Sequence, residues 1–199
     1  MGAQTGHLVG RAEELGSLDR VRAELVRGRS VAVLLIGEAG IGKTRLLTEF
    51  GARADAEGDL VLSGAASELE RDLPFSLFVD ALDEYVRGLD PELFVPLEDD
   101  VRTELAHVFP ALTTLGGDRP SALQHERYRS HRAVRALLEQ LASKQPLVLV
   151  LDDLHWADPA SVELLGALLR RPPSAPVMLA LASRPRQVPE RLSAALERA

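Results

Sequence analysis

The chain has 199 residues, of which 46% are hydrophobic, so it is long and apolar enough for one domain with a buried core. Its formal net charge of −7 at pH 7 argues against a nucleic-acid-binding surface, and the absence of cysteine excludes disulfides and thiolate metal sites. No apolar run approaches membrane-spanning length, and the N-terminus lacks the basic and apolar regions of a signal peptide, so we expect a cytoplasmic protein.

The first predicted element is a helix that opens at residues 8–11. Gly28 stands where its C-terminal cap is expected. The apolar face of this helix is formed by Leu15, Leu18, Val21 and Leu25. After the helix, residues 31–36 form an apolar run, which is typical of a strand buried on both faces.

Residues 37–44, Gly-Glu-Ala-Gly-Ile-Gly-Lys-Thr, fit the phosphate-loop pattern G-x-x-x-x-G-K-[ST]. Glycines let the backbone turn around phosphate oxygens with its N–H groups pointing inward. Lys43 would reach the β- and γ-phosphates, and the Thr44 hydroxyl would ligate Mg²⁺. The alternative is an ordinary glycine-rich turn between a strand and a helix. The residues expected to bind nucleotide here are Gly37, Glu38, Ala39, Gly40, Ile41, Gly42, Lys43, Thr44 and Arg45.

The flanks of this loop supply the strand–loop–helix context that the motif requires. The helix after it, from Thr44 to about Gly58, would turn the positive end of its dipole toward the phosphates. The patterns that follow predict, in order, a strand at 60–62, a helix at 74–89, short helices over 91–109 broken by Pro96 and Pro110, a loop at 115–120, and a long helix at 122–143.

The strongest strand pattern covers residues 147–152 and ends in an acidic pair. Asp158 then caps another helix that has Pro159 in its first turn. Residues 177–182 form a fourth strand, and a short helix pattern runs from about residue 189 to the end. Because apolar strands alternate with helices throughout, we expect an α/β fold with a parallel sheet covered on both faces.

The acidic pair is the expected partner of the phosphate loop. Asp152 would hold Mg²⁺, directly or through water, and Asp153 would act as general base on an attacking water. Two solvated carboxylates at the start of a loop are the alternative. Arg184, at the end of the fourth strand, would contact the γ-phosphate, or else is a surface arginine before a proline.

Two aromatic residues follow the acidic pair. Trp156 is interpreted as a packing residue. His155 either contacts a ligand or braces the loop, and the sequence leaves both possibilities open.

Three segments together resemble a known family. They are Leu-Val-Gly-Arg-Ala-Glu-Glu-Leu at 8–15, the phosphate loop through residue 46, and Leu-Asp-Asp-Leu-His-Trp-Ala-Asp at 151–158. The chain is similar to the nucleotide-binding domain of large ATP-binding LuxR-type transcriptional regulators. These are STAND signalling ATPases with a core related to AAA+ proteins. The resemblance covers about residues 8–184, and the 151–158 string is its most specific part.

The resemblance implies a P-loop NTPase of the additional-strand class, in which the fourth strand lies between the first and the third. It implies ATP or ADP and Mg²⁺ as ligands, with Lys43 and Thr44 on the phosphates and the metal. Asp152 would be the metal-site acid, Asp153 the acid beside it, and Arg184 the sensor. The segment lying over the adenine would include Val9, Gly10 and Arg11.

The resemblance also implies a role. Nucleotide would switch self-association and transcription in a longer protein, with DNA bound only through a C-terminal domain outside this chain. Residues 1–199 would then be one nucleotide-binding domain, a fragment lacking the lid, sensor and DNA-binding domains. Asp153 stands where vigorous AAA+ ATPases often carry Glu, so we expect weak hydrolysis. The alternatives are an AAA+-like ATPase that drives remodelling or loading, and a scaffold that nucleotide merely stabilises.

Overall fold

A computed structural model describes residues 11–115, 126–189, 192 and 195. Strands and helices alternate along the chain. The main elements are α1 (Ala12–Arg22), β1 (Val31–Ile36), α2 (Lys43–Ala56), β2 (Leu60–Ala65), α3 (Ser76–Arg87), α4 (Asp99–Val108), α5 (Glu126–Leu141), β3 (Leu147–Asp152), α6 (Pro159–Arg170) and β4 (Val177–Ser183). Short 3₁₀ helices are η1 (Leu25–Arg27), η2 (Glu68–Glu70), η3 (Pro91–Phe94), η4 (Pro110–Leu115) and η5 (Leu154–Trp156).

The four strands form a parallel sheet in the order β1-β4-β3-β2, which confirms both the expected fold class and the position of the fourth strand. Ile36 pairs in register with Ser183, and Ala65 pairs with Asp152. The carboxyl ends of the strands therefore meet at one edge. This edge receives the phosphate loop, the acidic pair and Arg184, as open parallel sheets generally position their ligand sites.

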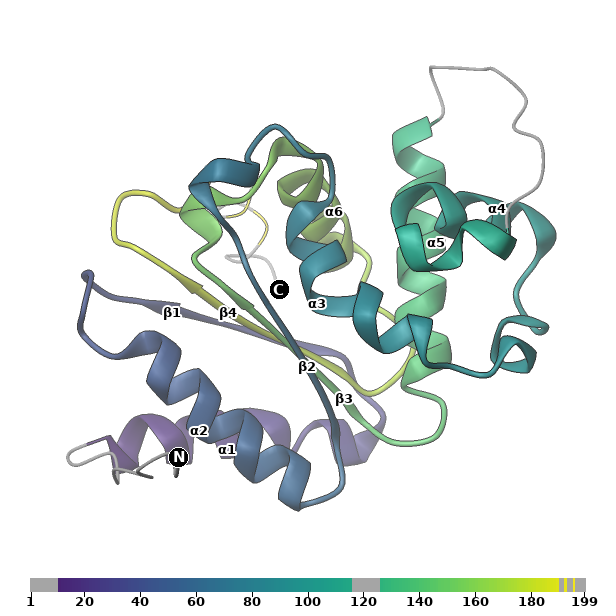
Figure 1. The fold of residues 1–199 in the computed structure, drawn as a ribbon. Helices are drawn as coiled ribbons and strands as arrows, with labels where there is room; N and C mark the ends of the chain where they lie inside the picture. Colours follow the sequence, from purple (N-terminus) through teal and green to yellow (C-terminus); the bar gives the residue numbers. More distant parts are fainter. Residues whose placement is uncertain (1–10, 116–125, 190–191, 193–194, 196–199) are drawn as a thin grey trace, which may run out of the picture.

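Helices cover both faces of the sheet, as expected (Figure 1). The face of β3 formed by Leu147, Leu149 and Leu151 packs in the core with α3, α5 and α6. The opposite face, with Val148 and Val150, packs against α1 and α2. Because successive strand side chains point to opposite faces, one apolar strand supplies both cores. Within the described residues, no helix combines the length and the apolar character needed to cross a bilayer.

Several predicted boundaries shift. The first helix begins at Ala12, with Arg11 as its N-cap, while Gly28 adopts a left-handed φ of 72° in the expected capping position. The helix expected at 122–143 is described from 126 to 141. The predicted loop at 115–120 and the predicted C-terminal helix lie almost wholly outside the described residues, where only Leu192 and Ala195 of that helix are described.

The second strand is twice as long as predicted, because it continues through Ser63, Gly64 and Ala65. The glycine there is a tertiary requirement. A Cβ at Gly64 would lie 2.8 Å from the backbone N of Ala81 and 2.8 Å from the carbonyl oxygen of Leu77, both in α3. The missing side chain at Gly64 therefore lets α3 lie directly on the sheet.

This close approach predicts that Gly64→Ala destabilises the fold by about 2–3 kcal/mol, because the methyl group meets backbone atoms that cannot rotate away. Gly16→Ala is the matched control. In the described part of the chain, nothing lies within 4 Å of a Cβ at Gly16. Gly16 is half-buried inside α1, and replacing a helical glycine with alanine should stabilise the fold by about 0.5–1 kcal/mol. Urea unfolding of both variants measures the difference, and equal stabilities would contradict the packing described.

Candidate phosphate-binding site

The loop after β1 has the backbone geometry of an anion cradle. Gly40 and Gly42 adopt φ values of 76° and 94°, a region that glycine enters without steric cost. Gly42 is the N-cap of α2, yet no described side chain caps this helix, and no acidic residue stands in its first turn. The first N–H groups of α2 are therefore free of a side-chain acceptor, which is the arrangement that favours phosphate at a helix N-terminus.

The Lys43 ammonium group lies across this loop. Its Nζ donates to the carbonyl oxygen of Gly37 at 2.8 Å and to that of Glu38 at 3.1 Å. The loop is also compact, because a Cβ at Gly37 would lie 2.9 Å from Cγ2 of Ile41. The positive charge is thus held at the mouth of the cradle by two neutral acceptors that a phosphate oxygen could replace.

The first turn of α2 reaches the acidic end of β3. Thr44 Oγ1 donates to Asp152 Oδ2 at 2.5 Å, and the Asp153 N–H donates to Asp152 Oδ1 at 2.7 Å. Asp152 is only 6% exposed. A hydroxyl and a carboxylate oxygen this close suit a small hard cation such as Mg²⁺.

Acidic and histidine side chains do not form a cluster of three or more that could hold a metal ion anywhere in residues 11–115 and 126–189. A metal ion at Thr44 and Asp152 would therefore take its remaining ligands from phosphate and water. Mg²⁺ usually binds nucleotide sites in this way, through one or two side chains. The residues present fit Mg²⁺ with a triphosphate.

Asp153 stands next to this pair in a strained conformation. Its φ of 51° lies in the left-handed region, which Asp tolerates better than most residues. Its side chain is 41% exposed, and Oδ1 lies 3.8 Å from Nδ1 of His155. Asp152 is thus buried among protein donors while Asp153 faces solvent at the same sheet edge, so only the second acid is free to reach a water molecule.

His155 is buried without hydrogen bonds. Its side chain is 2% exposed, and neither ring nitrogen has a hydrogen-bond partner among the described residues. Burial lowers the pKa of His155, and the positive charge of Arg184 lowers this pKa further. The lowered pKa favours the neutral imidazole, which has one N–H donor and one acceptor nitrogen.

Trp156 packs, as expected. Its ring lies 5.1 Å from that of His155, and the Arg71 guanidinium lies 5.6 Å from its centre.

Arg11 connects the segment before α1 to the phosphate loop. Its Nη2 donates to the carbonyl oxygen of Ile41 at 2.6 Å, and its Nη1 donates to Glu14 Oε1 at 3.1 Å. Val9 and Gly10, which the resemblance places over the adenine, lie outside the described residues. The structure thus brings one residue of that segment to the loop.

Asp158 has a larger role than the predicted helix cap. It accepts the Ser161 N–H at 2.9 Å, which confirms the cap. The same carboxylate accepts the Phe75 N–H at 2.9 Å and the Ser76 hydroxyl at 3.2 Å. One buried acid therefore holds the N-termini of α6 and α3 together. The Asp-Pro pair signals the first contact, but nothing in the sequence signals the second.

A cavity beside the Thr44–Asp152 pair contains a further acid that the sequence analysis missed. It has a volume of about 340 Å³ and is lined by Thr44, Asp152 and Asp80, among others. Asp80 Oδ2 accepts the Ala65 N–H at 2.8 Å, so this carboxylate secures the end of β2 next to the site. No sequence motif marks Asp80, because it lies inside α3 and reaches the edge only through packing.

The electrostatics predict the titration of His155. Its pKa should lie below the ordinary value near 6.5, and Arg184→Gln should raise it, because that change removes a repelling positive charge. The buried neutral ring also makes the fold less stable as the pH falls below about 6.5. NMR titration of the imidazole C–H signals in wild type and Arg184→Gln checks the pKa. A wild-type His155 pKa at the ordinary value near 6.5 would contradict this account, because it would show that the ring is hydrated.

Comparison with known proteins places the chain among nucleotide-handling domains. Residues 7–180 match the family of AAA ATPase domains. An uncharacterised protein of Rhizobium meliloti (strain 1021) is 30% identical over 224 aligned residues, covering 98% of this chain and 20% of that protein. This chain therefore spans about a fifth of the curated relative's length.

Among solved structures, the ORC2 protein of Aeropyrum pernix, in ADPNP–ADP complexes, is similar with a TM-score of 0.52. Its sequence identity is 17%, and the match covers 96% of this chain and 45% of that chain. A likeness at this identity speaks for the fold alone.

Proposed function

This chain belongs to the AAA ATPase domain family, and we propose that it binds Mg²⁺–ATP at residues 37–44 and acts as a nucleotide-dependent switch. The observation that carries the proposal is the 2.5 Å contact between the Thr44 hydroxyl and the Asp152 carboxylate. It joins the phosphate loop to the acidic strand end, where one metal ion would need both oxygens.

Each residue has a defined part in nucleotide binding. The N–H groups of the loop and of the first turn of α2 would donate to the phosphates, with Gly40 and Gly42 permitting the close approach. Lys43 would exchange its two carbonyl acceptors for phosphate oxygens, a stronger charge-assisted contact. Thr44 and Asp152 would hold the Mg²⁺ ion that neutralises the β- and γ-phosphates.

Hydrolysis would use the second acid. Asp153 would accept a proton from a water molecule whose oxygen attacks the γ-phosphorus, while the bond from that phosphorus to the bridging oxygen of ADP breaks. Arg184 would stabilise the charge on the γ-phosphate oxygens. The half-exposed side chain of Asp153 is shorter than Glu and is not tightly positioned, so we propose slow turnover, as suits a switch.

Loss of the γ-phosphate would be the signal. It removes a negative charge from beside Lys43 and Arg184, and so gives ATP and ADP different contacts with the same domain. The family also contains working ATPases, so an AAA+-like machine that drives remodelling or loading is the second candidate. Rapid, sustained turnover would favour that candidate.

This chain covers 20% of the curated relative's length, so a wider role would be that of a longer protein. We propose a STAND-type regulator of the LuxR class, in which nucleotide controls self-association and a separate domain contacts DNA. The motifs at residues 8–15 and 151–158 support this proposal. The net charge of −7 argues that any contact with DNA is made elsewhere in that protein.

Nucleotide binding should stabilise the fold. Mg²⁺–ATP at about 100 times its dissociation constant should stabilise the wild type by about 2.7 kcal/mol and raise its melting temperature by several degrees. Lys43→Ala should lose this increase, because it removes the ammonium group that meets the phosphates. Lys144→Ala is the matched control, since Lys144 is exposed and far from the loop in sequence. Equal shifts for wild type and Lys43→Ala would exclude the proposed site.

The proposed base has its own test. Asp153→Asn should reduce phosphate release at least about tenfold while leaving ATP affinity within about threefold, because only the proton acceptor is lost. Asn also adopts left-handed φ values readily, so the backbone at this position is retained. Asp55→Asn changes an exposed acid elsewhere and should hydrolyse like wild type. Wild-type rates in Asp153→Asn would remove Asp153 from the mechanism.

A further inference from the structure

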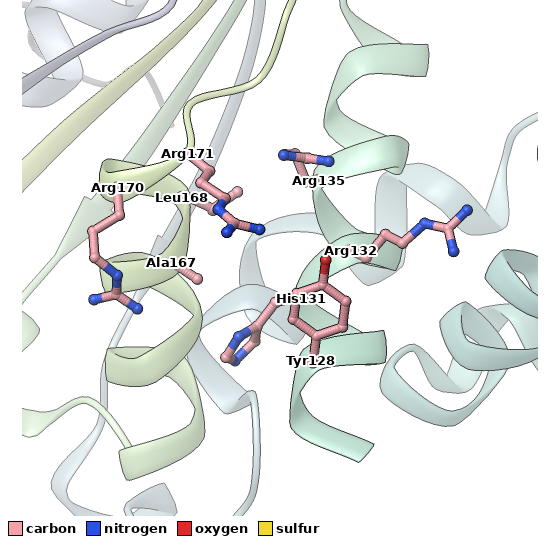
Figure 2. A pocket seen from close by; sticks show the side chains of 8 residues that line it. All are labelled: Tyr128, His131, Arg132, Arg135, Ala167, Leu168, Arg170 and Arg171. Atoms are coloured by element: carbon pink, nitrogen blue, oxygen red, sulfur yellow. The ribbon is translucent and has the colours of Figure 1, made fainter. Parts of the chain in front are cut away.

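A second cavity, of about 270 Å³, lies between α5 and α6 and is unusually basic for an acidic chain (Figure 2). Its lining includes Tyr128, His131 and four arginines, Arg132, Arg135, Arg170 and Arg171. The described contacts show that these arginines differ in what they already bind, and this difference determines the ligand that the cavity can accept.

Two of the arginines do not point into the space between the helices (Figure 2). Arg132 forms ion pairs with Glu98 and Asp100, and its side chain points away from α6 (Figure 2). Arg170 lies back along its own helix, where a Cβ at Gly166 would be 3.2 Å from its Nη1. It stands in the last turn of α6, where the helix dipole favours a cation. The charge of Arg132 is therefore already paired, and the side chain of Arg170 lies on the side of α6 that faces away from α5 (Figure 2).

The other two arginines face the space between the helices. Arg135 Nε is buried and has no hydrogen-bond partner among the described residues. It forms a long ion pair with Glu139, whose Oε1 lies 3.9 Å from Arg135 Nε, beyond hydrogen-bond distance, and already accepts the Ser174 N–H at 2.8 Å. Within residues 11–115 and 126–189, Arg171 has no acidic partner. An anion in this cavity would accept a hydrogen bond from the unsatisfied donor of Arg135 and would balance the charge of Arg171.

Figure 2 shows how these groups converge. The side chains of Arg171 and His131 reach into the space between the helices, and the Tyr128 hydroxyl is directed along α5 toward Arg135. Hydrogen-bond donors thus approach the cavity from α5 and from the C-terminal end of α6, and those of α5 lie at different heights along the helix. A carboxylate presents two oxygens in one plane, whereas a tetrahedral phosphate presents oxygens in several directions and carries the two charges that two guanidinium groups balance.

We propose that this cavity is a second anion site that binds a phosphate dianion, carried by a small phosphorylated molecule or as free phosphate. The volume lies just below the usual range for ligand pockets, so it accommodates a phosphate with a few further atoms and is too small for a nucleotide. The site is distinct from the phosphate loop, because its residues come from α5 and from the C-terminal end of α6.

The test uses the full chain carrying Lys43→Ala, so that the phosphate loop does not contribute to phosphate binding. Arginine Nε–H signals are followed by NMR during titration with inorganic phosphate, glycerol 3-phosphate and succinate at near-physiological salt. The Arg135 signal should move with both phosphates. Higher affinity for glycerol 3-phosphate identifies a phosphorylated small molecule as the ligand, and higher affinity for inorganic phosphate identifies the free ion.

Substitutions separate a built site from general attraction. Arg171→Gln, at an exposed position, should weaken binding at least about fivefold, and so should Arg135→Lys, which keeps the charge but loses the planar fork. Arg129→Gln, on the exposed surface of α5 and outside the cavity, should bind within about twofold of the parent chain. Unchanged affinity in Arg171→Gln, succinate binding equal to phosphate, or no movement of the Arg135 signal at millimolar ligand would each overturn the proposal.

Discussion

The hydrogen bond from Thr44 to Asp152, at 2.5 Å, is the contact on which the candidate site depends. These two residues come from opposite sides of β4, because the sheet order places this strand between β1 and β3. Helix α2 must therefore pass close over β4. The β4 side chains that face α2 near the carboxyl end are Ala180 and Ala182, both fully buried. Small side chains at these positions let the helix approach, and larger ones would lift Thr44 away from the acid.

The electrostatics of the edge follow from this arrangement. Asp152 is buried but accepts hydrogen bonds at both carboxylate oxygens, which offsets the cost of removing the charge from water. Among the described residues the His155 ring nitrogens have no such partners, and burial and the charge of Arg184 lower the pKa of His155, which favours the neutral ring. A neutral imidazole adds no further positive charge beside Lys43, so in the proposed site only the lysine and the arginine would meet the charge of the nucleotide.

Local chemistry explains what could be predicted from the sequence. The conformation of residues 37–44 depends on glycines that are visible in the sequence, and the cap at Asp158 is signalled by the proline after it. The strands β3 and β4 are buried throughout, as their apolar runs predict. The apolar run of β1 also predicted burial on both faces, but this strand lies at the edge of the sheet and is only partly buried. The strand order, in contrast, came only from the resemblance, since no local pattern specifies which strands become neighbours.

The features that were missed are all tertiary contacts. The length of β2 depends on Gly64 meeting α3, and the contact from Arg11 to Ile41 joins residues thirty positions apart. Asp158 likewise binds backbone from a helix some eighty residues earlier. The basic cavity is formed by parts of α5 and α6 that are separated in sequence by β3. Such juxtapositions follow from packing, which periodicity and spacing do not encode.

A structure of the chain with Mg²⁺ and a non-hydrolysable ATP analogue tests the central claim most directly. The account predicts one metal ion at about 2.1 Å from Thr44 Oγ1, with Asp152 bound to it directly or through water. It also predicts that Lys43 Nζ leaves the carbonyl oxygens of Gly37 and Glu38 for the phosphates. Nucleotide bound elsewhere, with Lys43 still on those carbonyl groups, would contradict it.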